Sequence, residues 1–211
     1  MTTETMPQPR KKVLTLVLGL GFFWWFLDQL TKYLAVSRLT RLMPEEAGLF
    51  ERLKLYLGTS DIQYLAKAPV TVLDPVWEHL YVQNPAGAFS FLLGMPPMVR
   101  RSIFLLAGVL ATAGIVYLAL RNPTASRWRV LVPLGVLLGG ALGNFTDRAF
   151  HGYVIDFIHW HYGTYSWPPF NIADACIVIG VAVLLIFGGD ILGAGDKEKA
   201  GKKGKGGKAR A

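Results

Sequence analysis

Four long apolar stretches constrain the fold of this chain more than any other feature. A helix that crosses a bilayer needs about 20 mostly apolar residues. Segments 13–36, 102–120, 130–147 and 172–192 meet that requirement. Charged residues make up only 17% of the chain, against about 25% in a typical soluble domain. The sequence therefore predicts a membrane protein with an all-α four-helix transmembrane bundle.

The first stretch has a second interpretation as a cleavable secretory signal. Arg10, Lys11 and Lys12 precede its apolar run, as in the n-region and h-region of such signals. No A-x-A cleavage pattern follows, and three further apolar spans do. We therefore expect a retained helix that opens a single four-span domain over residues 13–192, after a basic cytoplasmic tail at 1–12.

The formal net charge of +8 is concentrated in two tails. Residues 1–12 contribute +2 and residues 193–211 contribute +5. The second tail is rich in glycine and lysine and has no apolar residue larger than alanine, which predicts a disordered segment. Because the body between the tails is nearly neutral, we expect no nucleic-acid partner.

The distribution of lysine and arginine orients the spans. The two tails and the connector 121–129 hold three, seven and three basic residues. Loop 37–101 carries seven basic and six acidic residues, and loop 148–171 carries one of each. The pair Arg100–Arg101, at the outer end of the second span, is the exception. We predict that both termini are cytoplasmic and that both loops are extracytoplasmic.

Four carboxylates in apolar surroundings fall at one predicted level, the outer membrane face. Three spans and one loop contribute them: Asp28, Asp147, Asp156 and Asp174. A fifth, Asp190, lies near the inner face, where an interfacial position explains it. Ionisable residues at membrane depth are costly and usually functional, so the cluster predicts a site at the outer face.

Most of these residues also have a local explanation. Asp28 and Lys32 have the i,i+4 spacing of a simple ion pair. The residues Asn144, Asp147 and Arg148 could form an interfacial helix end.

At the start of the fourth span, Asn171 could be the N-cap, with Asp174 favoured by the helix dipole. None of these explanations accounts for Asp156 in its apolar segment. The glycines of the third span are expected to allow close helix packing rather than to bind a ligand: Gly139, Gly140 and Gly143.

Three histidines in the last outer loop raise the question of a metal: His151, His159 and His161. On an extended segment His159 and His161 would share a face, and such a pair with a nearby aspartate can bind zinc. Trp160 and Tyr162 alternate with them, however, and aromatic residues are common at membrane interfaces. We therefore predict no metal site.

A pair of carboxyl groups is the remaining source of chemistry. Cys176 has no obvious activating base, and the chain contains no G-x-S-x-G, GxxxxGK[ST] or GxGxxG motif. Two neighbouring carboxyls that share a proton can activate water and polarise a carbonyl without a cofactor. The sequence thus predicts hydrolysis of a peptide bond at the outer membrane surface.

Two other classes of function stay open. A small channel or transporter could use the acids as an ion pathway, but its ionisable groups would be spread through the membrane depth. A non-catalytic membrane scaffold leaves the clustered aspartates unexplained.

Four blocks of the sequence resemble lipoprotein signal peptidase (signal peptidase II), a family of bacterial aspartyl proteases that remove signal peptides from prolipoproteins. The blocks are FLDQLTKYLAV, YVQNPAGAFSFL, GGALGNFTDR through HGYVIDFI, and PPFNIADACIVIG. They occur in the order and the four-span layout of the family.

The resemblance implies that Asp156 and Asp174 form a catalytic dyad. It also implies a set of residues that bind substrate or support the dyad: Asp28, Lys32, Asn84, Asn144, Asp147, Arg148 and Asn171. Because Asp174 would lie at a helix N-terminus, we expect Asp156 to carry the shared proton.

The resemblance further implies the substrate and the setting. The substrate is a prolipoprotein whose lipobox cysteine bears a diacylglyceryl group, and cleavage falls just before that cysteine. No cofactor is implied. We expect a monomer in the bacterial inner membrane, in contact with membrane lipids, with its active site at the extracytoplasmic face.

Two departures from the family pattern concern the first outer loop. The family usually reads N-x-G-A-A-F where this chain has Asn84-Pro85-Ala86-Gly87-Ala88-Phe89, which displaces the glycine by one. Segment 37–68 is also longer than usual. Within the loop, LFERLKLYL is typical of an interfacial amphipathic segment, and VTVLDPVWEHLYV of two short strands broken at Asp74-Pro75. The resemblance implies that this region forms a small extracytoplasmic β-structure that cradles the substrate.

Overall fold

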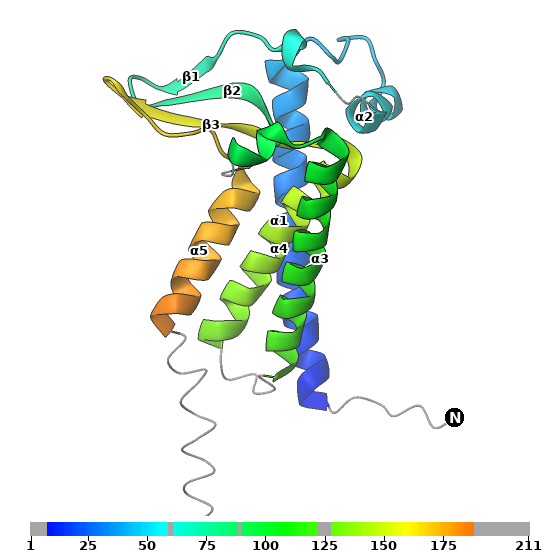
Figure 1. Ribbon diagram of the computed structural model, residues 1–211, viewed down its shortest axis with the longest axis vertical. Coiled ribbons are helices and arrows are strands. Elements are labelled where there is room, and N and C mark those ends of the chain that lie inside the picture. The colour runs from blue at the N-terminus through cyan, green and yellow to red at the C-terminus, as the bar shows by residue number, and fades with distance from the viewer. Residues whose placement is uncertain (1–7, 59–60, 88–89, 122–127, 188–211) are drawn as a thin grey trace, which may run out of the picture.

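Helices lying side by side form the long body of the molecule, and a small sheet lies across one end of it (Figure 1). The computed structural model describes residues 8–58, 61–87, 90–121 and 128–187. Within these residues the body is built from α1 (Gln8–Leu39), α3 (Pro97–Arg121), α4 (Trp128–Phe150) and α5 (Ile172–Phe187).

Among the described residues, three helices are long and apolar enough to cross a membrane, namely α3, α4 and the part of α1 from Arg10 onward. The fourth, α5, is apolar but has 16 residues. At about 1.5 Å per residue it is about 24 Å long, against a hydrocarbon core of about 30 Å. The end of the expected fourth span, 188–192, lies outside the described residues. The helical membrane body is therefore present, and the fourth crossing stays a prediction.

The two expected tails fall mostly outside the described residues. Helix α1 begins at Gln8, so part of segment 1–12 is helical, and residues 1–7 and 193–211 are not described.

Helix α4 is central, since it packs against α1, α3 and α5. Its glycines explain how closely the helices approach. A Cβ at Gly139 would overlap the side chain of Trp24 on α1, and a Cβ at Gly140 would lie 2.5 Å from the carbonyl oxygen of Ala173 on α5. The expectation that these glycines serve helix packing is confirmed.

The interior of the body at the end away from the sheet is apolar. Side chains of α1, α3 and α4 form one buried cluster there: Val13, Val17, Ile115, Ala119, Val130, Leu131, Leu134 and Leu138. On the outside of the helices, large apolar side chains such as Phe22, Leu106 and Leu185 are exposed. An apolar exterior around an apolar interior is what a bilayer requires of a helical body.

The sheet is antiparallel, with strand order β1–β2–β3–β4. Its strands are β1 (Val70–Leu73), β2 (Trp77–Asn84), β3 (Val154–Tyr162) and β4 (Tyr165–Ser166). The expected small β-structure is therefore present, and its first two strands are separated at Asp74-Pro75 as predicted. A register shift in β2 between His79 and Val82 sets which residues of β3 lie opposite its two ends.

Among the described residues of segment 37–101, α2 (Leu49–Gly58) lies beside the sheet end of α1 (Figure 1). Its Tyr56 is buried, with ring centroids 5.6 Å from Tyr33 and 5.1 Å from His151. The segment LFERLKLYL is thus helical, and its interfacial location stays a prediction. The part of the chain that the structure describes also contains 3-10 segments at Gln63–Leu65 and Ser90–Gly94.

Candidate active site

The polar residues singled out from the sequence meet where the helices reach the sheet. Helix α1, the end of α4, the start of α5, and strands β2 and β3 each contribute to this meeting point. Hydrogen bonds, ion pairs or electrostatic interactions join all nine: Asp28, Lys32, Asn84, Asn144, Asp147, Arg148, Asp156, Asn171 and Asp174.

Lys32 is the cation of a fully buried ionic group. Its Nζ lies 2.8 Å from a carboxylate oxygen of Asp28 and 2.8 Å from one of Asp147, and all three side chains have zero exposed surface. It also donates to Oδ1 of Asn144 at 3.2 Å. The group therefore joins α1 to α4, which a local i,i+4 pair would not do.

The two carboxylates of this group also hold the backbone of the neighbouring elements. Asp28 accepts the N–H of Ala173 in the first turn of α5 at 2.8 Å, and Asp147 accepts the N–H of Ile155 on β3 at 3.0 Å. Each carboxylate thus fixes the element that carries one of the two expected catalytic aspartates.

Gln29 is a further member that the sequence reasoning missed. Its side-chain amide donates to Asp147 at 2.9 Å and to the carbonyl of Gly143 at 3.3 Å. Gln29 lies next to Asp28 inside the block FLDQLTKYLAV, so its position in that block was the available signal.

Asn171 and Asp174 form a reciprocal cap at the start of α5. The N–H of Asp174 donates to Oδ1 of Asn171 at 2.9 Å, and the N–H of Asn171 donates to the Asp174 carboxylate at 3.3 Å. This is the geometry of a capping box, so the N-cap expected from the sequence is present. The amide of Asn144 adds a hydrogen bond of 2.7 Å to the other oxygen of Asp174.

Asp156 is held by two amides and is 1% exposed. The Nδ2 of Asn171 donates to its Oδ1 at 2.7 Å, and the Nδ2 of Asn84 donates to its Oδ2 at 2.8 Å. Asn171 therefore contacts both Asp156 and Asp174, and the two carboxyl groups are neighbours on either side of one asparagine.

The two carboxyl groups differ in environment. Burial raises the pKa of Asp156 to about 7, and the nearby carboxylate of Asp174 adds to the rise. Hydrogen bonds from Asn84 and Asn171 and the charge of Lys32 oppose this shift without cancelling it. Near neutral pH, Asp156 can therefore exist as a protonated carboxyl beside an acid at a helix N-terminus, where the dipole favours negative charge.

The turn after β2 accommodates the displaced glycine. Gly87 has φ of +58°, in the left-handed region that favours glycine, and its N–H donates to Oδ1 of Asn84 at 2.7 Å. Because the other end of the same amide binds Asp156, the turn fixes the orientation of Asn84 toward that carboxyl group.

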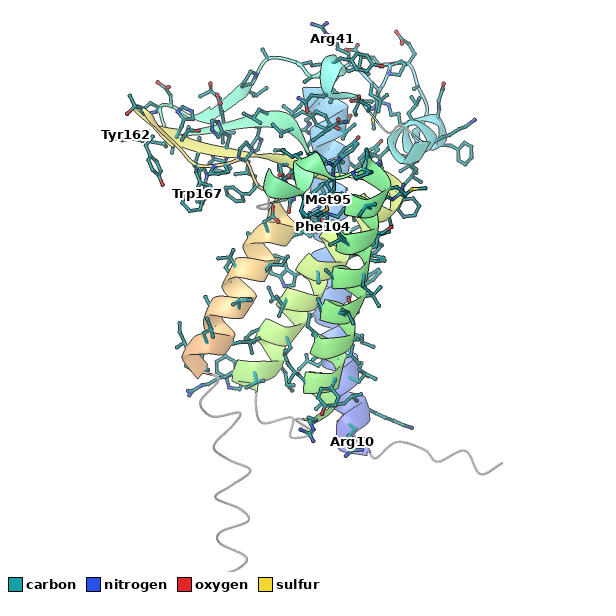
Figure 2. The ribbon with its side chains drawn as sticks, viewed as in Figure 1. Arg10, Arg41, Met95, Phe104, Tyr162 and Trp167 are labelled. Atoms are coloured by element: carbon teal, nitrogen blue, oxygen red, sulfur yellow. The ribbon has the colours of Figure 1, made fainter. Side chains whose placement is uncertain are left out.

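Arg148 lies beside this turn. Its guanidinium carbon is 4.2 Å from the ring centroid of Phe104, and its Nη1 donates to the carbonyl of Asn144 at 3.4 Å. Phe104 marks the sheet end of α3 (Figure 2). The carboxylates of Asp174 and Asp156 both act electrostatically on this cation, so its positive charge lies close to the expected dyad.

Other candidate residues lie elsewhere. His151 stacks on Tyr153 at 5.7 Å between centroids, and its backbone N–H donates to the carbonyl of Asp147 at 2.7 Å. Cys176 is a buried free cysteine on α5. Asp190 lies outside the described residues.

Known proteins are similar to this chain over most of its length. The family profile described as Signal peptidase (SPase) II matches residues 20–188. Lipoprotein signal peptidase of Anaeromyxobacter sp. (strain Fw109-5) is 40% identical over 168 residues, covering 77% of this chain and 79% of the relative. Lipoprotein signal peptidase of Xanthomonas axonopodis pv. citri (strain 306) is 36% identical over 154 residues, covering 73% and 86%.

Solved structures show the same fold. A bacterial membrane enzyme solved by the in meso method at 2.3 Å resolution has a TM-score of 0.59 and 25% identity, with 81% of this chain and 85% of the other covered. A second, solved at 1.9 Å, has a TM-score of 0.60 and 24% identity, with 84% and 93% covered. The profile match over most of the chain, together with these relatives, shows that the chain belongs to the signal peptidase II family.

Proposed function

We propose that this protein is a membrane aspartyl endopeptidase that removes signal peptides from prolipoproteins. Family membership supports the cleavage of prolipoprotein signal peptides. The single observation that carries the aspartyl assignment is the placement of Asp156 and Asp174 on either side of Asn171.

In the proposed reaction the two aspartates share one proton and bind a water molecule. Asp174 starts ionised and removes a proton from that water, while Asp156 starts protonated and donates its proton to the carbonyl oxygen of the scissile bond. The water oxygen forms a bond to the carbonyl carbon, which yields a neutral gem-diol. The raised pKa of Asp156 and the helix N-terminus at Asp174 support this division of roles.

Collapse of the gem-diol completes the cleavage. Asp174 now carries the proton taken from water and passes it to the departing amide nitrogen as the C–N bond breaks. Asp156 takes a proton back from a gem-diol hydroxyl as the carboxyl product forms, so the dyad regains its starting protonation. The two groups titrate as a unit, and the one-proton state is the active one.

The remaining polar residues are proposed to position the dyad. Lys32 and its two carboxylates hold the first turn of α5 and the start of β3, so they set the distance between the aspartates without touching substrate. Arg148 is proposed to supply positive charge beside both aspartates.

The substrate is proposed to be a prolipoprotein with a diacylglyceryl group on its lipobox cysteine, cut just before that cysteine. Acyl chains anchored in the bilayer would hold the scissile bond at the level of the dyad, which replaces a search in three dimensions by an oriented encounter. The setting that fits is the bacterial inner membrane, with four crossings, both termini in the cytoplasm and a monomeric enzyme.

A channel or transporter is the strongest competitor from another class. Its ion pathway would continue through the membrane depth. Here the aspartate group lies at the sheet end of the body, and the buried cluster between α1, α3 and α4 at the other end is apolar. This distribution supports hydrolysis over transport. Hydrolysis also explains why the aspartates are clustered, which a non-catalytic scaffold would not.

The test is to measure cleavage of a diacylglyceryl-modified prolipoprotein by purified Asp156→Asn and Asp174→Asn variants in lipid vesicles. Each variant should lose at least about a thousandfold in kcat, because the proposed reaction needs both carboxyl groups. Asp74→Asn, at an exposed aspartate between β1 and β2, is the matched control and should cleave normally. Substantial cleavage by either dyad variant would refute the aspartyl mechanism. Ion flux through vesicles that contain the wild-type protein, without cleavage, would favour transport.

A further inference from the structure

A second group of ligating side chains lies on the sheet, separate from the aspartates. We propose that Glu78, His159 and His161 bind one divalent transition-metal ion of the zinc class. The relevant atoms of these three side chains lie within 4.8 Å of one another. Two imidazoles and a carboxylate are a ligand set that zinc commonly uses when a water completes the tetrahedron.

The strand pairing creates this group. His159 and His161 are two residues apart on β3, so they project from the same face, and their ring centroids are 5.3 Å apart. Glu78 on β2 lies directly opposite His159. The expectation that no metal binds was drawn without Glu78, which is 81 residues away from His159 in the chain.

The separations fit a tetrahedral ion. Two ligand atoms about 2.0–2.1 Å from a zinc ion lie about 3.3 Å apart at the tetrahedral angle. The carboxylate of Glu78 is 2.8 Å from Nδ1 of His159 and, through its other oxygen, 3.9 Å from Nε2 of His161. These values bracket the required distance, so rotations of side chains alone would complete the coordination.

The orientation of His159 is already set for coordination. Its Nε2 is 2.8 Å from the hydroxyl oxygen of Ser166 on β4, and its Nδ1 faces Glu78. Histidine ligands commonly donate their second ring N–H to an oxygen, which leaves the first nitrogen free for the metal. Ser166 is therefore the positioning residue, and it comes from the strand that pairs with β3 at His161.

The group is accessible and independent of the dyad. The side chains of His159, His161 and Glu78 are 16%, 31% and 22% exposed, which leaves room for a water ligand. His159 is three residues beyond Asp156 on β3, about 10 Å along the strand, and faces the opposite side of the sheet. The far end of this sheet, marked by Tyr162 and Trp167, projects away from the helices (Figure 2).

A bound ion would tie β2 to β3 at their ends away from the dyad. These are the strands that carry Asn84 and Asp156 at their other ends. Imidazole ligands favour zinc and related transition metals over calcium and magnesium, which prefer oxygen. The expected occupant is therefore zinc rather than a hard cation.

The experiment uses the full-length protein in detergent micelles, with any affinity tag removed and all metal extracted by a chelator. Zinc is titrated by calorimetry, and cobalt(II) is titrated as a spectroscopic probe of tetrahedral nitrogen and oxygen coordination. We expect one zinc per chain, tetrahedral cobalt absorption, and a rise in Tm with zinc because the ion binds only the folded sheet.

Variants assign the ligands. His161→Ala and Glu78→Gln should each weaken zinc binding at least tenfold and abolish the rise in Tm, and Ser166→Ala should weaken it by about tenfold. The sheet histidine His79→Ala is the matched control and should bind as wild type. Prolipoprotein cleavage without added zinc, retained in every variant, verifies that each one folds. Failure of the wild type to bind zinc at equimolar concentration, or equal binding by the ligand variants, would overturn the proposal.

Discussion

Replacing Lys32 by methionine is the sharpest test of the buried ionic group. Methionine keeps the unbranched shape of the side chain and removes the charge that both Asp28 and Asp147 contact at 2.8 Å. Because none of the three side chains has exposed surface, water cannot replace the lost cation.

The size of the effect follows from this burial. Removing one partner of a buried ion pair costs about 3–5 kcal/mol, since the other charge stays buried and uncompensated. A loss of 1 kcal/mol lowers the Tm of a chain of this size by about 2–4 °C. Lys32→Met should therefore lower the Tm by roughly 6–20 °C. It should also lower kcat, because Asn144, which donates to Asp174, loses one of the two donors to its side-chain oxygen.

Thermal unfolding in detergent, followed by circular dichroism, measures the change. Lys67→Met is the matched control, because its ammonium group is exposed and donates to the carbonyl of Arg38 at 3.2 Å; its Tm should change by about 1–2 °C at most. The triple variant Lys32→Met, Asp28→Asn, Asp147→Asn removes all three charges, so no uncompensated charge stays buried. Its Tm should lie at least halfway from that of Lys32→Met back to that of wild type. A fall of less than about 2 °C in Lys32→Met alone would refute the reasoning.

Four further predictions concern the dyad and its support. Cleavage should decline as the pH rises through about 7, because Asp156 must be protonated; a rate that stays constant up to pH 9 would contradict this assignment. The raised pKa of Asp156 also makes the free energy of unfolding depend on pH. Between about pH 4 and pH 7 the folded state keeps the Asp156 proton, whereas the unfolded state has released it. The stabilisation is therefore complete below about pH 4 and is lost as the pH rises through about 7. The Tm of Asp156→Asn should therefore exceed that of wild type by more at pH 8 than at pH 5, and equal differences would argue against a raised pKa. Gly143→Ala places a Cβ against the Asp28 carboxylate, so it should lower the free energy of unfolding by about 1–3 kcal/mol and should reduce activity. Gly19→Ala is the control, because a Cβ there meets nothing within 4 Å, and its Tm should equal that of wild type. Asn171→Ala removes both the N-cap of α5 and the hydrogen bond to Asp156. It should lower the free energy of unfolding by about 0.5–2 kcal/mol and should change kcat more than KM. Asn171→Ser should restore the Tm but not kcat, and full recovery of kcat would show that only the cap matters.

The sequence predicted the parts of the fold that depend on local composition. Apolar runs located the helices, and the change of pattern around Asp74-Pro75 located the first two strands. The i,i+4 spacing also predicted the contact between Asp28 and Lys32. These predictions succeeded because each concerns residues that are close in the chain.

The sequence could not predict contacts set by the packing of distant elements. Asp147 completes the Lys32 group only because glycines bring α4 against α1. Glu78 faces His159 only because a register shift in β2 aligns the two strands at that end. The orientation of Asn84 required the turn at Gly87, whose φ of +58° the family pattern did not locate.

The sequence by itself therefore determined that this is a helical membrane protein of the signal peptidase II family, and it predicted a cluster of four aspartates at one level. Apolar length and residue order are enough for that conclusion, since transfer of a segment into a bilayer depends on its composition. Only the tertiary structure decided which carboxyl groups share Asn171 and why Asp156 has a pKa of about 7. Burial and electrostatic coupling change over a few ångströms, and at that scale the packing of α1, α4, α5 and the sheet sets every distance.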